Sequence, residues 1–143
     1  MTRAMLVTVL HRMDGSPAPK TESKFVDLKD DWYKNAVAWA AENGIVNGLD
    51  DDHFGPDGSV TREQAMTMLM RYAKYKGMDV SASADLSKFD DVGNVSQWAN
   101  EAVHWAVAMG LINGTTPTTL EPQGNSTRAQ VAAILMRFQS QQA

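Results

Sequence analysis

The sequence predicts an all-α fold built from repeated helix–loop–helix units. The main observation is an internal repeat: residues 32–71 and 98–137 align without a gap and share 16 of 40 positions. Apolar residues at helical spacing and Thr-x-x-Gln sequences at two helix starts are the other observations. A unit of this length buries its apolar face only by stacking on further copies of itself.

Composition and charge narrow the class of protein. The 143 residues suffice for one domain with a real core, and a net charge of −4 argues against nucleic-acid binding, which usually needs a basic patch. The absence of cysteine excludes disulfides, thiolate metal sites and cysteine nucleophiles. No apolar run reaches the length of a membrane span and no signal peptide is present. We therefore expect no membrane insertion, and an exported protein would contain this chain as a fragment of a longer precursor.

The first helix of each unit is expected to begin at a tryptophan, as in residues 32–43. Its apolar positions fall at i, i+4, i+7 and i+8: Trp32, Ala36, Trp39 and Ala40. Gly44 follows where a left-handed helix C-cap belongs. Large buried indoles are typical of a core, so Trp39 and the matching Trp105 are assigned to packing.

The second helix of each unit follows a polar loop rich in glycine and proline. Thr61 with Gln64 and Thr127 with Gln130 have the spacing of a capping box. Residues 2–12 align with these second helices, so the chain begins halfway through a repeat. In this shortened copy the apolar stripe is Leu6, Val9, Leu10 and Met13.

These copies predict a single domain over residues 1–143. Its parts are the second half of repeat 1 (1–15), repeat 2 (25–77), repeat 3 (89–143) and linkers at 16–24 and 78–88. A Phe-x-Asp element precedes each first helix, at Phe25 to Asp27 and Phe89 to Asp91. We expect the phenylalanine to pack and the aspartate to fix the turn into the helix.

Taken in order, these motifs closely resemble S-layer homology repeats over nearly the whole chain. The shared elements are Phe-x-Asp, Trp, Ala-Val, Gly-Ile/Leu, Asn-Gly, Phe/Leu-x-Pro and Thr-Arg-x-Gln. The resemblance implies a pseudo-three-fold spindle with a central helical bundle. It also implies non-covalent attachment of exported bacterial proteins to the cell wall, through an anionic secondary cell-wall polysaccharide that is often pyruvylated. In that family the ligand lies in grooves between neighbouring repeats, and the Thr-Arg motif supplies a key arginine.

Two features differ from the family pattern. The first repeat lacks its opening half, which an upstream segment or another chain would have to complete. The acidic residue of the usual Thr-Arg-Ala-Glu motif is replaced by Gln64, by Gln130 and, in the first copy, by Met5.

Three arginines, Arg3, Arg62 and Arg128, directly follow the capping threonines. A cation there faces the positive end of the helix dipole and needs a compensating partner. That partner is either a carboxylate of the fold, such as Asp27 or Asp91, or an anionic group of a ligand. The residues alone support both equally. The resemblance favours a ligand carboxylate held by the guanidinium and the helix N-terminus.

Tryptophans and glycines complete the predicted glycan site. Trp32 and Trp98 start helices and either pack in the core, which is the favoured interpretation, or stack on a sugar ring. Gly48 and Gly114 belong to Asn-Gly turns that call for positive φ, with close approach to a ligand as a second possibility. The full predicted set is Arg3, Arg62, Arg128, Trp32, Trp98, Asp27, Asp91, Gly48 and Gly114.

No catalytic or metal site is expected. The acidic run at 50–52 departs from the EF-hand pattern because Phe54 occupies a required position, and the matching loop at 115–119 has no acid. The histidines do not recur between copies and no catalytic motif is present. We expect no enzyme activity and no cofactor. Two alternatives to wall binding remain. One is a protein–protein or self-association module, in which the incomplete first repeat exposes the apolar helix of Leu6, Val9, Leu10 and Met13 to another chain or a missing upstream segment. The other is a calcium-stabilised glycan module.

Overall fold

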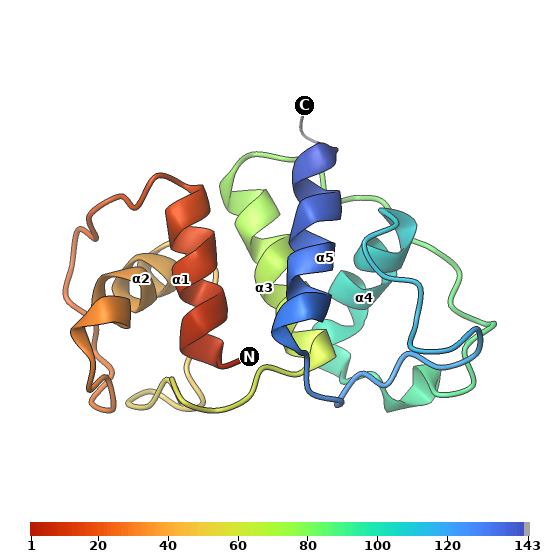
Figure 1. Cartoon of the computed structure of the whole chain (residues 1–143), viewed down its shortest axis with the longest axis horizontal. Helices are drawn as coiled ribbons and strands as arrows, with labels where there is room; N and C mark the ends of the chain where they lie inside the picture. The colour runs from red at the N-terminus through yellow and green to blue at the C-terminus, as the bar shows by residue number, and fades with distance from the viewer. Residues whose placement is uncertain (142–143) are drawn as a thin grey trace. The chain divides into compact units, whose positions relative to one another are not determined.

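Figure 1 shows the computed structural model of the chain, which describes residues 1–141. The described residues form α-helices and two short 3₁₀ helices, joined by long loops with isolated β-bridges and no strand. The helices are α1 (Arg3–Met13), α2 (Asp31–Glu42), α3 (Arg62–Tyr75), η1 (Val92–Asn94), η2 (Gln97–Ala99), α4 (Asn100–Ala108) and α5 (Arg128–Ser140). The all-α prediction is confirmed. The pseudo-three-fold packing and the division into repeats and linkers stay predictions.

The chain divides into two compact units, Met1–Val60 and Thr61–Ala143. The boundary falls between the loop and the second helix of repeat 2, so the compact units are out of phase with the sequence repeats. Each unit joins the second helix of one repeat to the first helix and loop of the next.

In the first unit α1 packs against α2. The His11 ring lies 5.1 Å from the Trp39 ring, and Trp39 is 1% exposed. Leu6 and Leu10 of α1 are also buried, at 2% and 0% exposure. The expectation that the shortened first repeat exposes an apolar helix is therefore wrong at these two positions, because the residues find cover within the described chain.

In the second unit α3 packs against α4, and α5 contributes an aromatic side chain to the core. The Phe138 ring lies 6.5 Å from Trp105 and 6.2 Å from Tyr72, in edge-on arrangements. Trp105 is 1% exposed, so the packing assignments of Trp39 and Trp105 are both confirmed. Each buries an indole that contributes a few kcal/mol relative to a small residue.

Helix ends follow the sequence signals closely. The Thr61 and Thr127 side chains accept from the backbone N–H of Gln64 and Gln130. In return, the backbone N–H of each threonine donates to Oε1 of the same glutamine. Gly44 has φ of 72° and caps α2 in the left-handed conformation, as predicted. In repeat 3 the α-helix begins only at Asn100, because Trp98 lies in η2.

The two Asn-Gly glycines differ from each other. Gly114 has φ of +96°, as predicted, whereas Gly48 is not in the left-handed region, so its predicted positive φ is wrong. Both positions exclude a side chain for another reason. A Cβ on Gly48 would lie 2.4 Å from the Phe25 ring, and one on Gly114 would lie 2.8 Å from the Phe89 ring. The backbone of each loop rests directly on the Phe-x-Asp phenylalanine.

Replacing Gly48 with alanine is expected to destabilise the chain by about 1–3 kcal/mol, because the new methyl group meets backbone and a buried ring. Urea unfolding followed by circular dichroism measures the change. Gly93→Ala is the matched control, since nothing lies within 4 Å of its added Cβ. That variant should be neutral or slightly stabilised. Equal losses in the two variants would contradict the close-packing explanation.

Candidate functional site

In the first unit, Arg3 reaches from the start of α1 into the loop of the next repeat. Its Nε donates to the Phe54 carbonyl at 3.0 Å and its Nη2 to the Asn47 carbonyl at 3.2 Å. The guanidinium carbon lies 4.7 Å from the centre of the Phe54 ring. Arg3 is 7% exposed, an unusual burial for a cation.

The second unit repeats this arrangement with Arg62. Its Nε donates to the carbonyl of Leu120 at 2.8 Å, and the residue is 8% exposed. Leu120 occupies the place of Phe54, so the carbonyl is kept while the ring beneath the guanidinium is lost. The repeat therefore preserves the hydrogen bond to the loop rather than the cation–π contact.

The loops also satisfy the first backbone N–H groups of both helices. Arg3 N–H donates to Gly58 and Ala4 N–H to Pro56, at 2.9 and 3.1 Å. The equivalent donors of α3, on Arg62 and Glu63, bind the carbonyls of Gly124 and Pro122 at 2.8 and 3.0 Å. The first N–H groups of a helix have no acceptor within that helix, and here carbonyls of the next repeat accept from them.

The Phe-x-Asp aspartates hold these same loops from the other side. The Asp27 carboxylate accepts from the N–H groups of Phe54 and Gly55 at 2.9 and 2.8 Å. The Asp91 carboxylate accepts from Leu120 and Glu121, both at 2.8 Å. The expectation that the aspartate fixes the turn into the first helix is wrong. It instead binds N–H groups of the loop that follows that helix.

Electrostatics in the loops favour ionised carboxylates. Burial alone would raise the pKa of Asp91, but the N–H groups of Leu120 and Glu121 and the nearby Arg62 lower it below its usual value. Asp27 shows the same balance, with its pKa lowered overall. Burial lowers the pKa of Arg3, which Asp27 partly offsets. Asp27 therefore offsets part of the cost of burying Arg3, and Glu121 and Asp91 do the same for Arg62.

Each guanidinium keeps nitrogen donors that have no acceptor among residues 1–141. No described residue accepts from Nη1 or Nη2 of Arg62, and neither nitrogen is among the enclosed polar atoms that lack a partner. The same holds for Nη1 of Arg3. These donors therefore reach solvent, while Nε anchors each arginine to its loop.

Arg128 does not share this environment. It follows the capping Thr127 as its counterparts do, but it is exposed, and no described residue accepts a hydrogen bond from its side chain. The structure therefore brings together Arg3 with Asp27 and the Gly48 loop, and equally Arg62 with Asp91 and the Gly114 loop. No loop within residues 1–141 donates to or accepts from Arg128 in this way.

The paired tryptophans at the helix starts are surface residues. Trp32 is 52% exposed and Trp98 55% exposed, so the favoured core assignment is wrong for both. Their position at the first turn of α2 and in η2 directs them away from the core. Trp32 lies edge-on to Tyr33 with ring centres 4.9 Å apart. Gly48 and Gly114 are half-buried, and the space beside each Cα is filled by a phenylalanine ring and by carbonyls of the same loop.

Sequence reasoning missed Glu63, which is 3% exposed. Its carboxylate accepts from the Ser96 N–H at 2.9 Å, the Ser96 hydroxyl at 2.7 Å and the Gln123 amide at 3.1 Å. A carboxylate in the first turn of a helix is stabilised by the helix dipole, and this position was the sequence signal that could have identified Glu63. A comparison of the repeats does not select Glu63, because α1 and α5 have alanine at this position.

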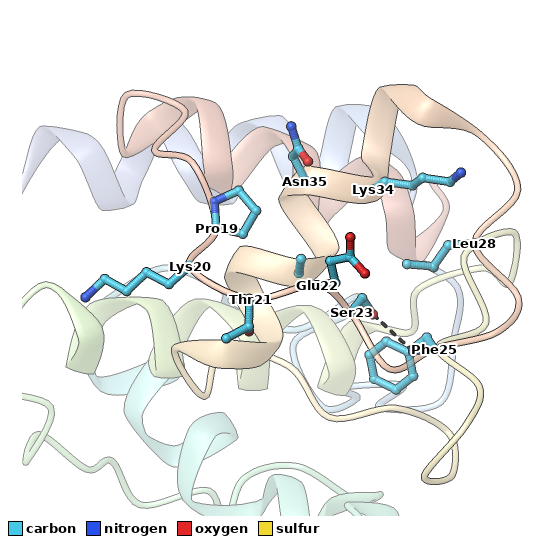
Figure 2. Close-up of a pocket in the computed structure, with 10 residues that line it drawn as sticks. Pro19, Lys20, Thr21, Glu22, Ser23, Phe25, Leu28, Lys34 and Asn35 are labelled. Carbon is cyan, nitrogen blue, oxygen red and sulfur yellow. Dashed lines mark hydrogen bonds between the residues drawn. The ribbon is translucent and has the colours of Figure 1, made fainter.

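A pocket of about 530 Å³ lies in the first unit between the 19–28 segment and α2. Figure 2 shows Lys20 and Lys34 at opposite ends, with their ammonium groups pointing away from each other. The equivalent hollow of the second unit, about 340 Å³, has Asn100, Glu101 and His104 at the matching helix positions. The repeat keeps a pocket at this place but neither its size nor its chemistry, and none of the nine predicted glycan residues lines either pocket.

None of the helices in residues 1–141 has both the length and the apolar character needed to cross a membrane. Within the same residues, no group of three or more His, Cys, Asp or Glu side chains is placed to hold a metal ion.

Comparison with known proteins gives consistent matches. The family model of the S-layer homology domain matches residues 24–66 and 88–132. An amylopullulanase from Thermoanaerobacterium thermosulfurigenes is 33% identical over 140 residues, covering 94% of this chain and 7% of that protein. The surface-layer 125 kDa protein of Lysinibacillus sphaericus is 34% identical over 117 residues, covering 79% and 10%. The cellulosome-anchoring protein of Acetivibrio thermocellus is 28% identical over 142 residues, covering 96% and 31%.

The matched segments hold the site described above except for Arg3, which precedes the first of them. Each runs from the Phe-x-Asp element through the Asn-Gly loop to a Thr-Arg helix start, ending within the second helix. The chain spans less than a third of each of these three relatives, which are far longer. With both full repeats matched by the model, and with their loops, aspartates and helix starts arranged alike, this chain belongs to the S-layer homology domain family.

Proposed function

We propose that this chain anchors a longer exported protein to the bacterial cell surface without a covalent bond. It would do so by binding an anionic cell-wall polysaccharide, with pyruvylated polymers as the foremost candidates. The binding positions are those where the second helix of one repeat meets the loop of the next. The observation that carries the proposal is the pair of arginines, Arg3 and Arg62, each anchored through Nε, with Nη1 of Arg3 and both Nη atoms of Arg62 left open to solvent.

The chemistry of these positions suits a carboxylate. A guanidinium edge offers parallel N–H donors that match the two oxygens of a carboxylate or of a pyruvate ketal. Because the arginines are largely removed from water, a charge-assisted hydrogen bond there is stronger than at a free surface. The net charge of −4 repels a polyanion at long range, so affinity would come from these local contacts.

The relatives support a binding role over catalysis. Proteins named as an amylopullulanase, an endoglucanase and a surface-layer protein match the same segment of this chain. A segment common to proteins with such different names is poorly suited to be the catalyst of any of them. One relative is named as a cellulosome-anchoring protein, which fits attachment as the shared task.

Trp32 and Trp98 extend the proposed site. Both indoles are about half-exposed at matching positions of the two full repeats. An exposed indole face stacks on the apolar face of a sugar ring, which the resemblance to a wall-binding family makes relevant. Asp27, Asp91, Gly48 and Gly114 would act by holding the loops in shape. Arg128 would bind a polymer less well, because no loop shields it from water.

Arg62→Lys is expected to weaken co-sedimentation with purified cell walls by about tenfold, since lysine keeps the charge but loses the guanidinium edge. The apparent dissociation constant from the sedimented fraction measures the effect. Arg71→Lys, on the same helix and outside any loop, is the control and should bind as the parent chain does. If walls stripped of their secondary polymer bind equally well, the glycan assignment fails.

The double variant Trp32→Ala/Trp98→Ala is expected to bind walls several-fold more weakly with a melting temperature within about 2 °C of the parent, because the indoles are half-exposed. Met136→Ala, which removes another exposed apolar side chain at 65% exposure and lies outside both loops, serves as control. Unchanged wall binding by the double variant would remove the tryptophans from the site.

Stability should fall in acid through the loop aspartates. The pKa of Asp27 and of Asp91 is lowered in the folded chain, so their contribution is fully present above the ordinary aspartate pKa of about 3.9. It is lost as the pH falls below that value. Melting temperatures measured from pH 5 to 2.5 should decline less steeply in Asp91→Asn than in the parent. Parallel declines would show that the carboxylate does not stabilise the loop.

A further inference from the structure

One buried carboxylate holds the segment that leads to Trp98. Glu63, in the first turn of α3, is 3% exposed and accepts from the N–H and the hydroxyl of Ser96 at 2.9 and 2.7 Å. Ser96 is the N-cap residue of η2, the short 3₁₀ helix that contains Trp98. The carbonyl of Ser96 accepts in turn from the Ala99 N–H at 2.9 Å. Glu63 therefore fixes the residue from which η2 begins.

Gln123 adds a second link between Glu63 and the same segment. Its Nε2 donates to Glu63 Oε1 at 3.1 Å and to the carbonyl of Asn94, the last residue of η1, at 2.6 Å. Gln123 belongs to the loop after α4, which also accepts from Nε of Arg62. Within the second unit, the backbone that carries Trp98 and the loop that anchors Arg62 are therefore joined through one carboxylate.

The first unit holds its corresponding segment with a different side chain. The N-cap residue of α2 is Asp30, which lies two residues before Trp32. The hydroxyl of Tyr33 accepts from the N–H of Asp30 at 3.3 Å and from that of Lys29 at 3.0 Å. Tyr33 is 1% exposed, and its ring lies edge-on to Trp32. A phenol oxygen thus serves the start of α2 as a carboxylate serves the start of η2.

The two acceptors alternate with alanine between the units. Ala99 stands in the second unit where the first has Tyr33, and Ala4 stands in the first unit where the second has Glu63. All four positions are at most 3% exposed. Each unit therefore contains one large acceptor and one alanine at this pair of buried positions. Such an exchange is expected where one acceptor must reach the N–H group before an exposed tryptophan, because a buried N–H without an acceptor is costly.

We propose that Glu63 is a positioning residue for glycan binding, which orients Trp98 for stacking on a sugar ring as the Tyr33 hydroxyl orients Trp32. This inference rests on the function proposed above. An indole that is 55% exposed is directed mainly by the backbone that carries it. Fixing that backbone before the ligand arrives lowers the entropy that binding must remove. Glu63 itself is buried and acts through Trp98.

The first test needs no ligand. Glu63→Ala should make amide hydrogen exchange of Ser96 about tenfold faster than in the parent chain, because the N–H loses its acceptor. Adding Ala99→Tyr, which transfers the phenol of the first unit, should restore slow exchange. Asp79→Ala is the matched control, since it removes an exposed carboxylate that accepts from the Ser81 N–H, and it should leave Ser96 unchanged. Unchanged Ser96 exchange in Glu63→Ala would overturn the proposal.

Tyr33→Phe gives an independent test in the first unit. It removes one oxygen and keeps the buried ring, so the chain should fold as the parent does. Exchange of the Lys29 and Asp30 amides should become about tenfold faster. Exchange at the parent rate would show that the phenol does not hold the start of α2, and would remove the comparison on which the role of Glu63 depends.

The second test is a double-mutant cycle on wall binding, at a temperature where far-UV circular dichroism shows every variant folded. Glu63→Ala should weaken co-sedimentation with purified cell walls about threefold when Trp98 is present, and by less than about 1.5-fold in a Trp98→Ala chain. A loss of stability alone would weaken binding equally in both chains. Asp79→Ala should change the binding of neither.

The outcomes separate this inference from the wall-binding function. Equal weakening with and without Trp98 would overturn the role of Glu63, and so would wall binding that Trp98→Ala leaves unchanged. Both results leave the wall-binding function standing on Arg62. That function fails instead if Arg62→Lys binds as the parent does and walls stripped of their secondary polymer still bind the chain.

Discussion

The structure depends on one loop held from two sides. An aspartate that precedes the first helix binds two N–H groups of the loop, and an arginine from the preceding repeat binds a carbonyl beside them. Long loops of this kind carry many backbone groups and little regular structure, so they need such external partners. The aspartate accepts from the backbone N–H of Phe54 or Leu120, and the arginine donates to the backbone carbonyl of the same residue. Both backbone groups of that residue are therefore hydrogen-bonded. The two charges also stabilise each other through the loop.

This arrangement accounts for a sequence feature that looked unfavourable. An arginine in the first turn of a helix opposes the helix dipole. In exchange it delivers a donor to a backbone carbonyl of the neighbouring repeat, where the charge of a nearby aspartate partly offsets the cost of its burial. The local cost is therefore offset between repeats, and the residue has a structural task as well as open Nη donors. The same side chain can serve the fold through Nε and a ligand through its other nitrogens.

Much of the fold could be predicted from the sequence, because helix periodicity and capping are local. The capping boxes at Thr61 and Thr127, the C-cap at Gly44 and the buried indoles of Trp39 and Trp105 all followed from spacing alone. The errors concern partners far along the chain. The loop that Asp27 binds lies 27 residues away, and nothing in its own neighbourhood indicates it.

The site could be predicted only in part, for the same reason. Comparison of copies selected Arg3, Arg62 and Arg128 as a set, since identical motifs suggest identical roles. Their surroundings differ because each arginine depends on the next repeat, a fact that no single motif contains. Glu63 was missed by the reverse error, since a residue found in one copy was taken to be unimportant. Trp32 and Trp98 were ranked as core because hydropathy does not reveal which way a helix start faces.

The compact units and the sequence repeats begin at different residues, and this limits how many repeats a chain of this kind can combine without unused binding groups. The contact between neighbouring repeats is head-to-tail: one partner gives an arginine and the other gives a loop. A linear array of complete repeats joined by such contacts retains one unused arginine at one end and one unused loop at the other, however many copies it has. Only a closed ring uses all of them, and closure fixes the number of copies by geometry instead of by sequence length.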